Sequence, residues 1–261
     1  MSIELNYLDT GGDGTPLVVI HGLFGSADNW RSHIKVWEER YRVVAVDLRN
    51  HGRSPHIEGM EYGEMVDDVV ALLDRLSIPR VHLLGHSMGG KVAITLARQA
   101  PERVASLIIG DIAPVAYGHD HDSVMAGLRR VKEGRPANRR EADALLAEHV
   151  KERAVRLFLA TNLMRGEAGG LTLRLGLDEI EAGYESVMKE PAGTGPFTGP
   201  TLVLRGSASH YVVEEHLPAL YEVLPEARLI TLEAGHWLHA EKPEAFRDAI
   251  NAFVEEVEAA A

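Results

Sequence analysis

The chain has 261 residues, 45% of them hydrophobic, which fits one large α/β domain or two small ones with a substantial core. Its formal net charge of −12 argues against nucleic acid or anionic membrane as a general partner, because phosphate binding needs a positive surface. The absence of cysteine excludes disulfides, cysteine nucleophiles and thiolate metal sites. The first ten residues lack the features of a signal peptide, and no apolar run reaches membrane-spanning length, so we expect a cytoplasmic protein.

Short apolar runs alternate with amphipathic stretches from Leu17 onward, which is typical of βαβ units around a parallel sheet. The runs predicted as buried strands are Leu17–Ile20, Val43–Val46, Val81–Leu84, Ser106–Ile109, Thr201–Leu204 and Arg228–Leu232. Ligands of open parallel sheets bind beyond the carboxyl ends of the strands, so the loops that follow these runs are where we expect chemistry.

Helical patterns lie between and after the strands, at Tyr62–Leu76, Gly89–Gln99, Glu214–Val223 and Pro243–Val257. Between Pro114 and Gly199 the βα rhythm stops, and three further helices are predicted there, at Ser123–Glu133, Arg139–Thr161 and Leu177–Lys189. The sequence therefore predicts a mostly parallel α/β core formed by residues 1–113 and 200–261, with a helical cap of residues 114–199 inserted into it.

The segment Gly85–Gly89 reads G-H-S-M-G, directly after a predicted strand and at the start of a predicted helix. On such a tight strand-to-helix turn, small glycines let the chain close while the serine hydroxyl projects above the sheet. The helix N-terminus then favours negative charge that develops nearby. Ser87 is therefore the predicted nucleophile.

The loop His21–Gly25 follows the first strong strand. Acyl transfer creates an oxyanion, which needs preorganised N–H donors. We expect the backbone N–H of Leu23 to be one donor, with that of Phe24 as the alternative, and the N–H of Met88 to be the other. His21 itself is interpreted as a loop histidine that forms local hydrogen bonds.

A general base for this serine is expected late in the chain, after the last predicted strand, where Ala234–Trp237 reads A-G-H-W. His236 is therefore the predicted base. The histidines that compete for this role are His21, His86, His210 and His239.

The acid is less direct to assign. Many α/β-hydrolases carry it after the strand Thr201–Leu204 in a G-x-x-D pattern, but this chain has Ser209 at that position. Asp111 ends the strand after the nucleophile helix, and it keeps the chain order Ser, Asp, His. We therefore predict Asp111 as the acid, with capping of the loop before Pro114 as its alternative role, and Ser209 as a fourth, hydrogen-bonding member.

Three other patterns are assigned structural roles. Gly11–Gly14 is interpreted as a turn, because no strand–helix context makes it a phosphate loop. Gly118–Asp122 has residue types that bind metals but is interpreted as a solvated loop. Asp47 is expected to hold the loop Arg49–Ser54. No metal or organic cofactor is predicted.

Five segments together carry a family resemblance: His21–Ser26, Asp47–Pro55, Gly85–Lys91, Asp111–Val115 and Gly235–Pro243. They resemble the YbfF-type bacterial esterases of the α/β-hydrolase superfamily, which are close to the mitochondrial abhydrolase-domain proteins. The resemblance covers the core, whereas the cap carries no matching motif. Residues 207–211 read S-A-S-H-Y where relatives often have G-N-S-P-Y, so His210 departs from the pattern.

The resemblance implies hydrolysis of short acyl esters, or of acyl-CoA thioesters, with the acid at Asp111 and the family's serine at Ser209. The substrate is expected to be a small acyl ester or thioester. Apolar side chains expected to line the acyl pocket or bind substrate are Phe158, Leu159, Leu163, Met164 and Trp237. The same triad of Ser87, His236 and Asp111 could also serve a perhydrolase, a carbon–carbon hydrolase or lyase, or a small-ligand receptor that hydrolyses slowly.

Overall fold

A seven-stranded sheet forms the centre of the computed structural model, which describes residues 1–261. The strand order is β1-β3-β2-β4-β5-β8-β9, and every neighbouring pair is parallel except β1 with β3. The strands are β1 (Tyr7–Asp9), β2 (Thr15–Ile20), β3 (Tyr41–Val46), β4 (Val81–His86), β5 (Val104–Gly110), β8 (Thr201–Gly206) and β9 (Ala227–Leu232). The predicted α/β fold with a mostly parallel sheet is confirmed, and β1 is an edge strand that the sequence analysis did not predict.

Both faces of the sheet are covered, so successive residues of a central strand enter two different cores. In β2, Val18 and Ile20 belong to the larger core, whereas Leu17 and Val19 belong to the smaller one. This explains why β2 reads as a continuous apolar run instead of an alternating one.

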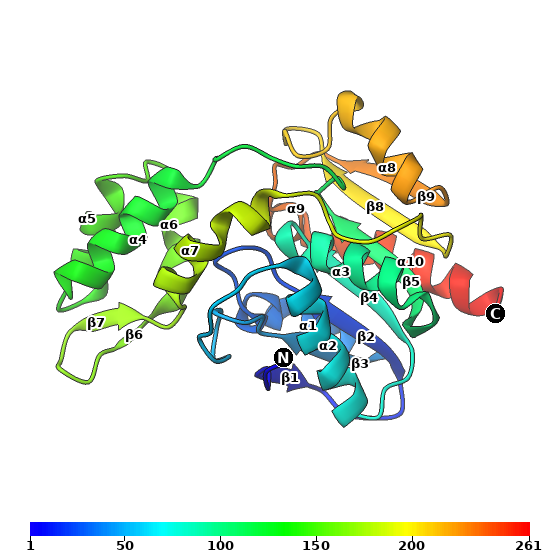
Figure 1. Ribbon diagram of the computed structural model, residues 1–261, viewed down its shortest axis with the longest axis horizontal. Coiled ribbons are helices and arrows are strands. Elements are labelled where there is room, and N and C mark those ends of the chain that lie inside the picture. The colour runs from blue at the N-terminus through cyan, green and yellow to red at the C-terminus, as the bar shows by residue number, and fades with distance from the viewer.

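Helices pack on the two faces, as Figure 1 shows. The larger core includes residues of α2 (Tyr62–Arg75), α3 (Met88–Gln99) and α8 (Leu217–Val223). The smaller core includes residues of α1 (Arg31–Trp37) and α10 (Pro243–Ala259). The short α9 (Leu238–Glu241) precedes α10, and 3₁₀ turns lie at η1 (Ala27–Trp30), η2 (Pro101–Arg103), η3 (Ala160–Asn162) and η4 (Glu214–His216). Helix α1 was not predicted from the sequence.

The inserted region gathers at one end of the molecule (Figure 1). It contains α4 (Asp122–Gly134), α5 (Arg139–Ala147), α6 (Arg153–Leu159) and α7 (Leu177–Met188). The prediction of one helix over Arg139–Thr161 is wrong, because the chain breaks between α5 and α6. There the guanidinium of Arg156 donates hydrogen bonds to the backbone carbonyls of Val150 and Lys151, at 3.1 and 2.7 Å.

The inserted region also contains a small antiparallel hairpin of β6 (Leu163–Arg165) and β7 (Leu171–Leu173), which was not predicted. Its turn depends on Gly169 and Gly170, whose φ angles are +86° and +71°. Only glycine adopts such angles at low cost, so this G-G pair makes the tight return possible.

Candidate active site

The turn between β4 and α3 holds Ser87 in a strained conformation, with φ 54° and ψ −122°. Positive φ is unfavourable for a residue with a side chain, and such strain is concentrated at functional sites. Close backbone contacts around the turn require the two glycines of the motif. A Cβ on Gly85 would lie 2.1 Å from the carbonyl oxygen of Gly89, and one on Gly89 would lie 2.4 Å from that of His21.

The structure brings Ser87, His236 and Asp111 together in one hydrogen-bonded chain. The Ser87 hydroxyl donates to Nε2 of His236 at 3.0 Å, and the Nδ1–H of His236 donates to Oδ2 of Asp111 at 2.7 Å. Asp111 is fully buried, whereas 23% of the His236 side chain is exposed. The imidazole of His236 therefore contacts a buried carboxylate through Nδ1, whereas its other side is partly exposed.

The carboxylate of Asp111 is held from the neighbouring strand end. Its Oδ1 accepts the backbone N–H of Gly206 at 2.9 Å, and its Oδ2 also accepts the hydroxyl of Ser209. The Ser209 oxygen in turn accepts the N–H of Tyr211 at 3.2 Å. Ser209 thus lies beside the predicted acid, and both carboxylate oxygens accept hydrogen bonds.

The two candidate oxyanion amides differ in their hydrogen bonds. The N–H of Phe24 donates to Nε2 of the buried His51 at 3.1 Å, so Phe24, the alternative donor, is already engaged and does not fit the role. The N–H of Leu23 has no acceptor among the protein's own groups. The N–H of Met88 opens α3, and the first N–H groups of a helix have no intrahelical acceptor. Leu23 and Met88 are therefore the free pair beside Ser87.

A cavity of about 630 Å³ opens at Ser87 and His236. Phe158, Leu159 and Trp237 line it, and the rings of Phe158 and Trp237 lie 5.3 Å apart between the inserted region and the core. The expectation that Leu163 and Met164 line the substrate pocket is wrong. Leu163 is buried in the larger core, and Met164 points outward from the hairpin with 41% of its surface exposed.

An aromatic side chain that the sequence analysis did not assign supports the base. The ring of Tyr211 stacks on the imidazole of His236, with centroids 4.0 Å apart and planes inclined by 26°. The hydroxyl of Tyr117 donates to the Tyr211 carbonyl at 2.5 Å and accepts the N–H of Ala113 at 2.9 Å. This network ties the Ser209 loop to the loop that follows Asp111. No motif indicated it, because stacking is visible only once the two loops are adjacent.

Two of the histidines considered as bases, His86 and His21, have structural positions, as does the neighbouring His33. The Nε2–H of His86 donates to the carbonyl oxygen of His236 at 2.8 Å, and that of His33 donates to the carbonyl of His239 at 2.8 Å. The ring of His21 accepts the N–H of Leu48 at 3.0 Å and bonds the carbonyl of Gly22, as a loop histidine would. His86 thus holds the backbone of His236, the predicted base, in place.

Burial lowers the pKa of these histidines. The pKa is about 3 for His86 and about 4 for His33, and the pKa of His239 lies well below its usual value near 6.5, in each case chiefly through desolvation. They are neutral in the folded protein at neutral pH. Because the unfolded chain binds protons at each of them below about pH 6.5, the free energy of unfolding falls there by about 1.4 kcal/mol per pH unit for each histidine.

We therefore expect the unfolding midpoint in urea to fall as the pH is lowered from about 8 to about 5, with most of the loss below about 6.5. Replacing His33 with glutamine should make this loss shallower, whereas His210→Gln, at an exposed side chain, serves as the control and should leave it unchanged. A midpoint that is constant over this pH range would contradict the burial of neutral histidines.

The remaining sequence predictions concern loops. Asp47 accepts the N–H groups of Arg53 and Ala27, at 2.9 and 2.7 Å, and so holds the loop Arg49–Ser54 as predicted. In the Gly118–Asp122 loop, His119 pairs with Glu185 at 2.8 Å, and no group of three or more histidine, aspartate or glutamate side chains is placed to hold a metal ion. None of the helices has the length and apolar character required to cross a bilayer.

Comparison with protein families decides the identity of the fold. A family model described as "alpha/beta hydrolase fold" matches residues 15–243 of the chain. The chain belongs to the α/β-hydrolase family. The fold, the position of Ser87 after β4 and the late histidine of this hydrolase agree with that membership.

The hydrolase resembles esterases and lipases over nearly its whole length. It is 39% identical to the mouse sn-1-specific diacylglycerol lipase ABHD11, over 97% of this chain and 85% of that protein. It is 35% identical to the esterase YbfF of Escherichia coli, over 93% and 94% of the two chains. A solved marine microorganism esterase superposes with a TM-score of 0.93 at 34% identity, covering 97% of this chain and all of the other. The hydrolase therefore acts on ester bonds.

Proposed function

We propose that this hydrolase is a serine carboxylesterase that cleaves short to medium acyl esters through an acyl-enzyme on Ser87. The observation that carries the proposal is the hydrogen-bonded chain from Ser87 through His236 to Asp111, which ends at the cavity. Nucleophile, base and orienting acid stand within hydrogen-bond reach of one another, which is what the chemistry requires.

In the proposed mechanism, Nε2 of His236 takes the proton of the Ser87 hydroxyl as its oxygen attacks the ester carbonyl. The oxyanion is stabilised by the N–H groups of Leu23 and Met88, which cost no reorganisation because they are already fixed. The imidazolium then gives its proton to the departing alcohol. Water, activated by the same nitrogen, releases the acid from Ser87, while Asp111 stabilises the charged ring throughout.

Residues 114–199 are proposed to act as a cap over this site. Phe158 and Leu159 of α6 line the large cavity together with Val155. Asn162 ties the cap to the oxyanion loop, since its side-chain amide donates to the carbonyl of Phe24 at 2.9 Å and is buried. Substrate binding and the position of the Leu23 amide are thereby linked through one loop.

Charge favours oxygen esters over CoA thioesters as substrates. The large cavity has no lysine or arginine in its lining, and its one carboxylate is that of Glu241. The phosphates of CoA would meet no cation there, because Coulomb attraction to phosphate needs Lys or Arg nearby. Diacylglycerol, named for the mouse relative, is a second candidate that a lining without lysine or arginine also suits.

A panel of small esters tests the proposal. We expect rapid hydrolysis of p-nitrophenyl acetate and butyrate, and labelling by a fluorophosphonate at a single site that peptide mass spectrometry assigns to Ser87. S-acetylpantetheine should have a kcat/KM at least as high as acetyl-CoA, because the two thioesters differ only in the nucleotide and its phosphates.

Two rival functions, a CoA thioesterase and a small-ligand receptor, predict different outcomes. A kcat/KM for acetyl-CoA more than about tenfold above that of the truncated thioester would show phosphate recognition and favour a CoA thioesterase. Very slow turnover of all esters, together with a change in the cap's hydrogen exchange when a small ligand binds, would favour a receptor.

A further inference from the structure

Two cavities of very different size meet at Ser87. The large one measures about 630 Å³, and a second one on the other side of the nucleophile measures about 20 Å³. Ser87 and Leu23 line both cavities. His236 and Trp237 line the large cavity only, whereas Met88 lines the small one only.

The position of the base distinguishes the two cavities chemically. In the proposed mechanism the alcohol departs with a proton from Nε2 of His236, so its oxygen must lie on the side of the imidazole. That side is the large cavity. The acyl carbon stays on Ser87 with its oxygen toward the Leu23 and Met88 amides, and the chain attached to it must extend away from the imidazole.

We propose that the small cavity is the acyl pocket and the large cavity holds the alcohol. The enzyme then selects acetyl and propionyl esters while accepting bulky alcohols. This inference rests on the proposed serine esterase function. It adds that the protein selects the acyl part of the ester by size.

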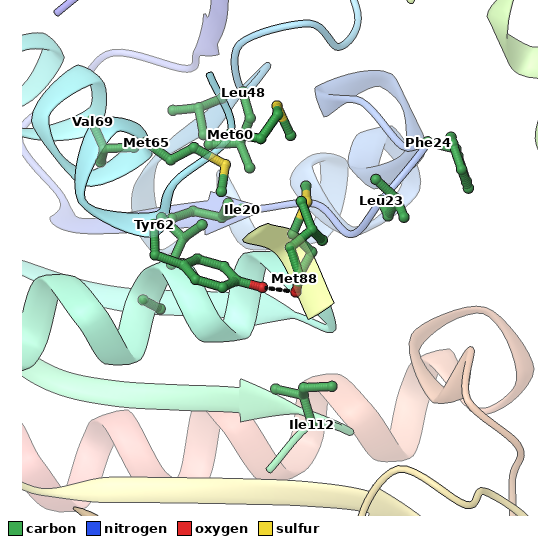
Figure 2. Packing of buried hydrophobic residues seen from close by; sticks show 14 of the residues in the cluster. Ile20, Leu23, Phe24, Leu48, Met60, Tyr62, Met65, Val69, Met88 and Ile112 are labelled. Atoms are coloured by element: carbon green, nitrogen blue, oxygen red, sulfur yellow. Dashed lines mark hydrogen bonds between the residues drawn. The ribbon is translucent and has the colours of Figure 1, made fainter. Parts of the chain in front are cut away.

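The walls of the small cavity are mostly apolar, with Lys91, Asp120 and His121 also lining it, and they come from separate elements. Met88 of α3 and Ile112, which follows β5, face it from the core, and Val187 and Met188 at the end of α7 close it from the cap. Figure 2 shows Met88 and Ile112 together with Tyr62, whose hydroxyl donates to the Val187 carbonyl at 2.6 Å. The cap therefore contacts the core directly at this pocket.

Lys91 lies at the far side of the pocket, where its side chain is buried and hydrogen-bonded. Its side chain is 1% exposed, and its Nζ donates to the carbonyl of Lys189 at 2.6 Å and lies 4.7 Å from the ring centre of Tyr117. Burial lowers the pKa of Lys91 to about 7. A chain that fills the pocket would next meet this polar amine, so further methylene groups would gain no apolar contact.

The size of the pocket sets the limit on the acyl chain. A cavity of about 20 Å³ has room for little more than one water-sized group. It therefore accepts roughly a methyl or ethyl group without rearrangement. Each methylene beyond this limit should lower kcat/KM by about tenfold or more. We therefore expect p-nitrophenyl acetate and propionate to be the best substrates, with hexanoate at least about tenfold poorer.

Enlarging the pocket should relax this limit. The experiment measures kcat/KM for the p-nitrophenyl acetate-to-hexanoate series with Met188→Ala and, as a second variant, Val187→Ala, with thermal unfolding to show that each is folded. We expect Met188→Ala to raise the hexanoate-to-acetate ratio by about tenfold. The matched control is Phe158→Ala in the large cavity, which should change KM for all acyl lengths alike.

Two results would overturn the assignment: hexanoate hydrolysed as well as acetate by the native enzyme, or a hexanoate-to-acetate ratio that rises with Phe158→Ala but not with the folded Met188 and Val187 variants. The second result would exchange the roles of the cavities. Neither would affect the proposed esterase function, whose failure would instead appear as no hydrolysis of any ester.

Discussion

The Ser87→Ala enzyme is expected to hydrolyse p-nitrophenyl acetate with a kcat at least about 10⁴-fold below that of the native protein. Alanine removes the only hydroxyl that donates to Nε2 of His236, and with it the acyl-enzyme route. The residual rate should come from water attacking a substrate that is still held by the Leu23 and Met88 amides. Steady-state release of p-nitrophenol measures the loss.

Folding should be unaffected by this change. Ser87 already carries a Cβ at φ 54°, so alanine adds no backbone strain, and its hydroxyl is not needed to cap α3. The matched control is Ser207→Ala, which removes an exposed hydroxyl close to the site and should retain the native rate. If Ser87→Ala kept more than about a tenth of the native kcat, the nucleophile would have to be another group.

The core of the fold was predictable because long apolar runs and strand-to-helix turns leave strong patterns. The two halves of β2, Leu17 with Val19 and Val18 with Ile20, face different cores, and a fully apolar run is the signature of that arrangement. Helix α1 and strand β1 were not predicted, because α1 has seven residues and β1 three, too short for either period to appear. The hairpin of the inserted region depends on glycine φ angles rather than on side-chain periodicity.

The catalytic candidates also divide into residues that local patterns predict and residues whose role depends on tertiary contacts. Ser87 and His236 follow from local motifs, and Asp111 follows from chain order once Ser209 occupies the usual position of the acid. Their mutual hydrogen bonds agree with these predictions. Tyr211 could not be predicted, because its stacking on His236 depends on where two loops meet.

Pocket residues were the least predictable part of the site. Phe158 and Met164 both looked suited to an apolar pocket, yet Phe158 lines the large cavity and Met164 faces outward. The cause is the unpredicted hairpin, whose strands send successive side chains to opposite faces. Val187 and Met188 were predicted as helical, but the contact between the end of α7 and Ser87 is a tertiary feature with no local signal.

The Asp111→Asn enzyme is expected to have a kcat/KM at least about 100-fold below the native value, from a change of one atom. The native carboxylate accepts three hydrogen bonds near its buried position, from Gly206, Ser209 and His236. A carboxamide has a single acceptor oxygen. If that oxygen stays on the Gly206 N–H, the amide NH₂ faces Nδ1 of the imidazole and forces the tautomer that carries its proton on Nε2. That tautomer cannot accept the Ser87 proton.

The neighbouring loop offers a specific rescue of this variant. Ser209 already contacts Oδ2 of Asp111, so adding Ser209→Asp to Asp111→Asn returns a carboxylate to the site from the strand end where many α/β-hydrolases carry it. We expect the double variant to recover at least about tenfold over Asp111→Asn alone in the p-nitrophenyl acetate assay. Asp122→Asn, at an exposed side chain in the cap, is the control and should retain native activity. An Asp111→Asn enzyme with native kcat/KM would show that the reaction does not need the carboxylate of Asp111 to orient His236.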